Sequence, residues 1–193
     1  MGRLGIHDFY DVIVFSESET RASYLIGKQD IVVEAVKVLA EEMPEAIFLA
    51  RPRYSAEELR RNFYDQPNVH IFSEPIDMQS LVAKADLLIG GGATLNIEAA
   101  YYGTPVIACR PITCRYEQFL LDRWLAVKAH TVDEVVSLAY ELLGKRNDDK
   151  TRQVFDNYLD YAILANSVGD LQFDITVTAE DGIGYLDIYV PPE

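Results

Sequence analysis

The fold is decided by the stretch Leu87-Leu-Ile-Gly-Gly-Gly-Ala-Thr-Leu-Asn-Ile-Glu98. An aliphatic run typical of a buried strand leads directly into three glycines, and residues 93–102 have the pattern of a helix. Glycine has no Cβ, so it lets the backbone turn tightly and lets a ligand approach the chain. A strand, a glycine-rich turn and a helix in this order predict an α/β unit of the kind that builds Rossmann-like sheets.

The same alternation of apolar strands and amphipathic helices continues on both sides of this stretch. Strands are predicted at residues 10–15, 46–50, 69–72, 86–89, 105–108 and 125–129, and helices at 31–43, from 55, at 77–85, 93–102, 116–121, 131–143 and 150–164. Near-continuous apolar strands are typical of sheets that are buried on both faces. We therefore predict a Rossmann-like parallel sheet of about six strands, with helices on both faces, in a domain of residues 1–167.

The end of the chain has a different pattern. Residues 171–178 and 185–190 alternate apolar and polar side chains around turn-forming residues at 181–184. This pattern predicts an antiparallel hairpin, which we treat as an appendage of residues 168–193. The hairpin is expected either to pack on a sheet edge or to pair with another chain, and in the second case the protein would be a homodimer.

Composition excludes several classes of function. The formal net charge of −14 argues against nonspecific binding to nucleic acid, whose affinity comes from lysine and arginine on phosphates. No apolar run approaches the roughly 20 residues that a membrane helix needs, and the first residues lack the apolar core of a signal peptide. We expect a cytoplasmic protein that does not span a membrane.

Metal and cofactor chemistry are not expected from the residues present. The three histidines, His7, His70 and His130, are scattered along the chain. The two cysteines, Cys109 and Cys114, are expected to be reduced packing thiols, because no cluster of histidine or cysteine accompanies them. We predict no metal site and no cofactor.

The glycine-rich turn is the best candidate for a binding site. The N–H groups of the first helical turn, together with the helix dipole, favour an anion, so a diphosphate over Gly91, Gly92, Ala93 and Thr94 fits this geometry. Glu98 lies about one turn further along the same helix face, where its carboxylate could accept hydrogen bonds from ribose hydroxyls. The alternative is a tight strand–helix turn with a solvated or partnered Glu98 and no ligand.

A family resemblance appears at these residues. The stretch Ala85 to Ile107, with its glycines, Glu98-Ala-Ala and Gly103-Thr-Pro, resembles the donor-binding C-terminal half of GT-B glycosyltransferases. It is similar to the N-acetylglucosaminyltransferase that acts on the lipid-linked peptidoglycan precursor and to UDP-N-acetylglucosamine 2-epimerase, and it resembles most the domain of unknown function family 354. The resemblance covers roughly residues 11–143. Its motif says little about which sugar is bound or which reaction is catalysed.

The resemblance implies a role for each matching position. Gly92, Ala93 and Thr94 would give amides to the diphosphate of a nucleotide-sugar, UDP being the expected nucleotide, and Glu98 would bind the ribose. The resemblance also implies that the base lies beside Glu74-Pro75-Ile76 and that the sugar hydroxyls are reached by Glu117 and Gln118. Residues 16–20 would border the phosphates from the opposite side. Within that last segment, Glu17 and Glu19 are unexpected neighbours for a diphosphate.

The resemblance also implies that the chain is half of a two-domain enzyme. The acceptor half would be missing or on another chain, and a catalytic base cannot be assigned. Arg51 and Arg110, each just after a predicted strand, could counter a phosphate charge, as could Arg21, or each could pair with an acid at the surface. The alternative function is a non-catalytic regulatory or interaction module that retains the Rossmann-like fold.

Overall fold

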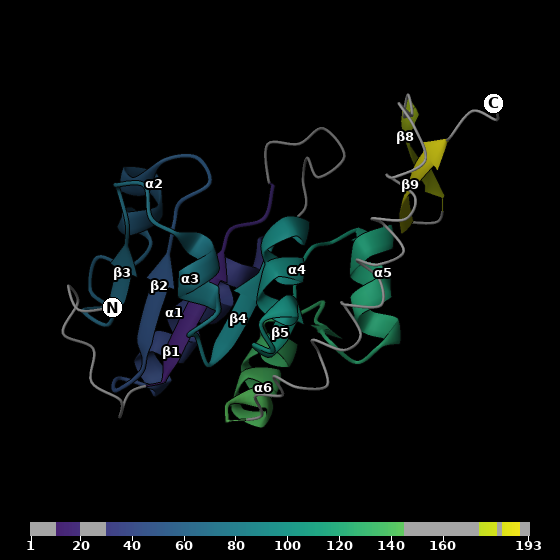
Figure 1. Ribbon diagram of the computed structural model, residues 1–193. Helices are drawn as coiled ribbons and strands as arrows, with labels where there is room; N and C mark the ends of the chain where they lie inside the picture. Colours follow the sequence, from purple (N-terminus) through teal and green to yellow (C-terminus); the bar gives the residue numbers. More distant parts are fainter. Residues whose placement is uncertain (1–10, 20–29, 145–173, 181–182, 190–193) are drawn as a thin grey trace.

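The computed structural model describes residues 11–19, 30–144, 174–180 and 183–189. Its main sheet has six strands, all parallel, in the order β3-β2-β1-β4-β5-β7. Figure 1 labels β3, β2, β1, β4 and β5 of this sheet. The six strands are β1 (Val12–Ser16), β2 (Ile47–Ala50), β3 (Val69–Ile71), β4 (Leu87–Gly90), β5 (Val106–Ala108) and β7 (Val127–Lys128). The prediction of a six-stranded parallel sheet is confirmed.

Helices cover both faces of this sheet, as predicted. The helices are α1 (Ile31–Glu42), α2 (Ala56–Arg61), α3 (Met78–Val82), α4 (Ala93–Tyr101), α5 (Arg115–Asp122) and α6 (Val132–Leu142). One apolar cluster joins α1, α2 and α6 to the sheet, and a second joins α3, α4 and α5 to its other face. Along β1, Ile13 and Phe15 belong to the first cluster and Val12 and Val14 to the second, which is why these four positions are all apolar.

The strand order reverses between β1 and β4. From β1 the chain builds outward through β2 and β3, and it then returns to place β4 on the other side of β1. In open α/β sheets, ligands bind beyond the carboxyl ends of the strands at such a switch point. The loop after β1 and the glycines after β4 both lie at this point.

The C-terminal hairpin is present and joins a second, smaller sheet. β8 (Asp174–Glu180) and β9 (Ile183–Tyr189) are antiparallel, and β9 pairs in parallel with the two-residue strand β6 (Thr113–Cys114). Pairing with another chain remains a prediction. The helix predicted at 150–164, the boundary at 167, His7 and Arg21 lie outside the described residues.

Candidate functional site

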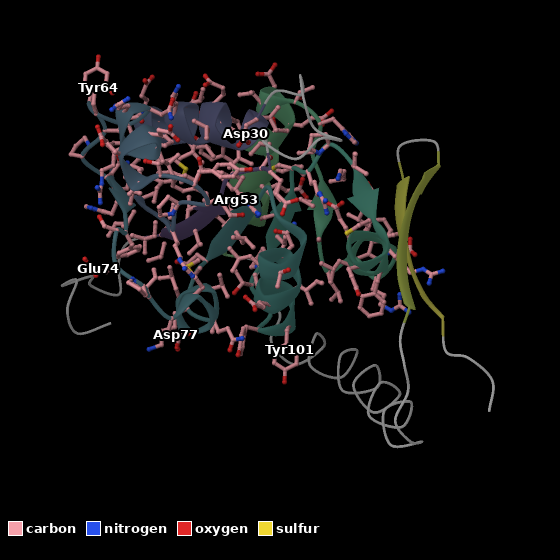
Figure 2. The ribbon with its side chains drawn as sticks, turned by 90° about the horizontal axis from the view of Figure 1, so that it is seen from above. Asp30, Arg53, Tyr64, Glu74, Asp77 and Tyr101 are labelled. Atoms are coloured by element: carbon pink, nitrogen blue, oxygen red, sulfur yellow. The ribbon has the colours of Figure 1, made fainter. Side chains whose placement is uncertain are left out.

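A cavity of about 740 Å³ opens at the carboxyl ends of the parallel strands, which is a usual size for a small-molecule site. Residues from the loops after β1, β2, β3 and β5 line it, together with the first turns of α3 and α4. Figure 2 looks down on this edge of the sheet and shows Arg53 between Asp30, at the start of α1, and Asp77, at the start of α3. The cavity therefore lies at the switch point of the sheet.

Helix α4 begins at the cavity without a side-chain cap. Its N-cap residue, Gly92, makes no side-chain cap bond, whereas Asp30, Ser55 and Asp77 cap α1, α2 and α3 with their side chains. The first N–H groups of any helix lack partners within the helix. Gly92 and the exposed Thr94 line the cavity, so the structure brings this helix start to the site.

The N–H group of Gly91 does not face the cavity, although the glycine pattern suggested that it would contribute to the anion site. Gly91 is buried, and its N–H donates to the carbonyl oxygen of Ser16 at 2.9 Å. A Cβ at Gly91 would stand 2.4 Å from the backbone nitrogen of Ser18, so this glycine lets the loop after β1 pack against the turn after β4. The amides at the cavity therefore begin at Gly92 and not at Gly91.

Glu98 and Ile76, for which the resemblance implied contacts with a nucleotide-sugar, both line the cavity. Glu98 is half-buried, and the Nε2 of Gln79 lies 3.5 Å from its Oε1. Ile76 precedes Asp77, whose carboxylate accepts from the backbone N–H groups of Gln79 and Ser80. The Ser80 hydroxyl also donates to this carboxylate. That hydroxyl, followed by the backbone N–H groups, lowers the pKa of Asp77. Asp77 thereby fixes the start of α3 beside α4.

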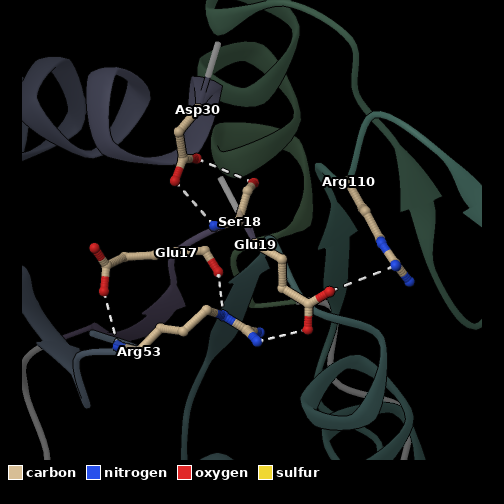
Figure 3. Close-up of polar contacts among 6 residues, drawn as sticks. All are labelled: Glu17, Ser18, Glu19, Asp30, Arg53 and Arg110. Atoms are coloured by element: carbon tan, nitrogen blue, oxygen red, sulfur yellow. Dashed lines mark hydrogen bonds and ion pairs between the residues drawn. The ribbon is translucent and has the colours of Figure 1, made fainter. Parts of the chain in front are cut away.

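The two glutamates after β1 bind arginines (Figure 3). The Glu17 carboxylate accepts the backbone N–H of Arg53 at 2.8 Å, and the Glu17 carbonyl accepts its Nε at 3.3 Å. Glu19 contacts Arg53 through one carboxylate oxygen at 2.7 Å and Arg110 through the other at 3.6 Å. Burial raises the pKa of Glu17, and the Arg53 N–H acts in the opposite direction. These acids therefore hold the arginines at the cavity.

Asp30 anchors the same loop from the other side. Its carboxylate caps α1 through the N–H of Val32 at 3.1 Å. It also accepts the N–H of Ser18 at 2.9 Å and the Ser18 hydroxyl at 3.1 Å. Ser18 is almost fully buried, so the backbone between Glu17 and Glu19 is held on both sides.

Glu117 and Gln118 do not line the cavity in this structure. Glu117 is 2% exposed, and its Oε1 lies 2.9 Å from the Nζ of Lys128, which also donates to the carbonyl of Arg110 at 2.5 Å. Burial raises the pKa of Glu117, and Lys128 opposes this shift. Gln118 is exposed and donates to Asp122 at 2.7 Å. A contact of either residue with a sugar stays a prediction.

None of the histidines and cysteines in the described part of the chain lines the cavity. His70 and His130 are exposed on β3 and after β7, and neither lines it. Cys109 and Cys114 are not joined in a disulfide, and burial raises the pKa of the Cys109 thiol. Among the residues that the structure describes, no group of His, Cys, Asp and Glu could hold a metal ion, and no helix has both the length and the apolar character that crossing a membrane requires.

Sequence reasoning missed Arg53 and Gln79. Arg53 stands two residues after Arg51 in the run Arg51-Pro52-Arg53, just beyond β2, and both arginines line the cavity. Its position after a parallel strand was the available signal. Gln79 carries no such signal, because its place near Glu98 depends on how α3 packs on α4.

Comparison with known proteins agrees with this architecture. A family model described as "Protein of unknown function (DUF354)" matches residues 2–169. An uncharacterized protein of Methanocaldococcus jannaschii is 27% identical over 165 residues, which are 82% of this chain and 47% of that protein. The chain thus spans about half the length of the curated relative that it matches.

Solved structures with the same fold are also about twice as long. UDP-GlcNAc 2-epimerase of Methanocaldococcus jannaschii, solved with UDP-GlcNAc and UDP, has a TM-score of 0.57 at 13% identity, over 79% of this chain and 46% of that one. A putative UDP-N-acetylglucosamine 2-epimerase from Listeria monocytogenes gives 0.57 at 19% identity, over 75% and 39%. The glycotransferase of kitacinnamycin gives 0.53 at 14%, over 82% and 43%. The chain therefore has a Rossmann-like fold of the type found in such enzymes.

Proposed function

The chain belongs to the family of proteins of unknown function whose model matches residues 2–169, and we propose from that premise that its cavity binds the diphosphate and ribose of a nucleotide-sugar. One observation carries the proposal. The uncapped start of α4 and Glu98, one helical turn further on, line the same cavity. Arg53 and Arg110 line it as well, so anion donors and a hydroxyl acceptor lie side by side.

The chemistry of the site suits a diphosphate. The N–H groups of a helix start and guanidinium groups bind phosphate oxygens through charge-assisted hydrogen bonds. The same groups would stabilise the negative charge that develops on a diphosphate leaving group during transfer of the sugar. UDP is the nucleotide to test first, because structures with this fold have been solved with UDP-GlcNAc and UDP.

The proposed role is that of a donor half. The chain covers between 39% and 47% of the similar proteins named above. We propose that a second Rossmann-like half, in the same gene product or in a separate subunit, would supply the acceptor and the catalytic base. The chain described here would then bind UDP, with a dissociation constant of about micromolar to millimolar, and catalyse little by itself.

A titration with UDP tests this role. Backbone amide signals of Gly92 to Thr94 should shift at millimolar UDP, and Glu98→Gln should weaken UDP binding about tenfold or more, since it removes a charged acceptor. The matched control is Glu41→Gln, the same change at an exposed position of α1. UDP that lacks the ribose 2′-hydroxyl should bind more weakly than UDP to the unaltered protein, and this difference should shrink in the Glu98 variant.

Two results would contradict the proposal. One is the absence of any shift at the start of α4 with millimolar UDP. The other is a Glu98→Gln protein that keeps its fold and binds UDP as well as the control variant does. Either result would favour the non-catalytic interaction module that the sequence left open.

A further inference from the structure

The carboxylate of Glu19 lies between two arginines that come from different parts of the sheet (Figure 3). Its Oε1 is 2.7 Å from Nη1 of Arg53, which follows β2, and its Oε2 is 3.6 Å from Nη2 of Arg110, which follows β5. The Glu19 side chain is 35% exposed and the Arg110 side chain 15%, so the pairs are partly shielded from water. A single carboxylate thus bridges the two guanidinium groups.

Arg53 lies where an anion would approach helix α4, and Arg110 lines the same cavity. A Cβ built on Gly92, the N-cap residue of α4, would stand 2.6 Å from Nη2 of Arg53 and 4.0 Å from the hydroxyl oxygen of Ser16. That hydroxyl is buried and has no hydrogen-bond partner among the described residues. Arg53, Ser16 and the helix start therefore surround the same small region of the cavity.

A phosphoryl group and a carboxylate make the same demand on a guanidinium group. Both accept its N–H donors in a planar, often bidentate arrangement. Two anions held by the same donors would repel each other. The cavity is lined by four carboxylates and three arginines, so an incoming anion finds no surplus of positive charge while Glu19 remains in place.

We propose that Glu19 is an internal competitor for the phosphate position. In the protein without ligand it holds Arg53 and Arg110, and a phosphoryl group of the ligand takes over these two arginines and displaces the carboxylate. The inference rests on the proposed function only in that the ligand carries phosphate, and it does not depend on the nucleoside. A ligand without phosphate gains nothing from this displacement.

Calorimetric titration of three probes tests the inference: UDP, inorganic pyrophosphate and uridine. Glu19→Gln keeps the shape of the side chain and removes its charge, and it should tighten UDP and pyrophosphate about threefold to tenfold while leaving uridine unchanged. Glu19→Asp keeps the charge but shortens the side chain, so it should give a smaller gain. The matched control is Glu57→Gln, because Glu57 also pairs with an arginine, Arg61, on the surface of α2.

Repeating the Glu19→Gln substitution in a protein that lacks one of the arginines shows whether Glu19 changes anion affinity through them. In Arg53→Gln protein, adding Glu19→Gln should tighten pyrophosphate less than it does in the unaltered protein. Unfolding midpoints of all variants show that the fold is kept. An equal gain in both backgrounds would mean that Glu19 acts only through the general charge of the cavity, and the inference would be wrong.

The outcomes separate this inference from the proposed function. If Glu19→Gln leaves both phosphate probes unchanged while UDP binds and Glu98→Gln weakens it, the competitor role is wrong and the nucleotide site stands. If the variant tightens pyrophosphate but UDP binds no better than pyrophosphate, Glu19 is a competitor at an anion site without a nucleoside. A gain for uridine equal to that for UDP, or no binding of any probe to any variant, overturns the inference.

Discussion

Replacing Gly91 and Gly92 by alanine, one at a time, separates folding from ligand binding at two adjacent positions. Neither glycine has a positive φ, so alanine can adopt the backbone conformation at both, and the difference lies in the space around the new Cβ. At Gly91 that Cβ would stand 2.4 Å from the nitrogen and 2.7 Å from the Cα of Ser18. At Gly92 the nearest atom to the new Cβ would be Nη2 of Arg53, at 2.6 Å, and the next nearest would be 3.8 Å away.

The expected magnitudes follow from what has to move. The backbone at Ser18 is held by Asp30 through two hydrogen bonds, so Gly91→Ala must displace a fixed loop and should destabilise the protein by about 1–3 kcal/mol, as overpacking does. At Gly92 only the end of the Arg53 side chain has to move, at the expense of its contacts with Glu17 and Glu19, so Gly92→Ala should cost less, about 1 kcal/mol at most. Its methyl group would instead stand at the approach to the helix start, and UDP affinity should fall about tenfold, or 1.4 kcal/mol.

Urea denaturation and UDP titration measure the two effects. With a slope of about 2 kcal/mol per molar urea, a loss of 2 kcal/mol moves the midpoint of Gly91→Ala down by about 1 M. Each variant serves as the control for the other. A Gly91→Ala protein as stable as the unaltered one would refute the packing explanation for this glycine, and unchanged UDP affinity in Gly92→Ala would show that no phosphate lies over Gly92.

Two further predictions concern buried polar contacts behind the site. Lys128→Met leaves Glu117 buried without its cation and should cost about 3–5 kcal/mol at pH 7. Since burial already raises the pKa of Glu117, the folded protein binds this proton more tightly than the unfolded chain, and the loss should shrink as the pH falls through the raised pKa. Denaturation at pH 5 and pH 7 measures this, and equal losses would contradict it. Thr104→Val removes the donor to the Val82 carbonyl at 2.6 Å and should cost about 1–3 kcal/mol in thermal unfolding, whereas an unchanged midpoint would show that this bond contributes little.

The main sheet could be predicted because its pattern is local. A run such as Val12 to Phe15 is short, apolar at every position and rich in β-branched residues, which is typical of a strand buried on both faces. The two-residue strands were harder: β6 was not predicted, and β7 was expected over residues 125–129 but spans Val127–Lys128. Strands this short have no periodicity, and their existence depends on the neighbours with which they pair.

The candidate site was predictable to the extent that it is local. Gly92, Thr94 and Glu98 lie within seven consecutive residues: Gly92 is the N-cap of α4, and helix geometry alone places Thr94 and Glu98, four residues apart, on one face. The contact of Glu19 with Arg53 and Arg110 joins three loops, separated by 34 residues or more, and no local pattern encodes it. One signal was present for Glu117: a lysine inside an apolar strand, Lys128, requires a buried acid as its partner.

The distribution of partners among the four carboxylates of the cavity bears on the kind of ligand. Glu17 and Glu19 accept from arginines, and Asp77 accepts from the backbone at the start of α3. Glu98, among the described residues, has one long contact of 3.5 Å with Gln79. It keeps acceptor capacity on the same helix whose first N–H groups lack partners within the helix, roughly one 5.4 Å turn away. An inorganic anion would use only the donors, while a ligand with hydroxyl groups one turn from its phosphates uses both, and a nucleoside diphosphate has that arrangement.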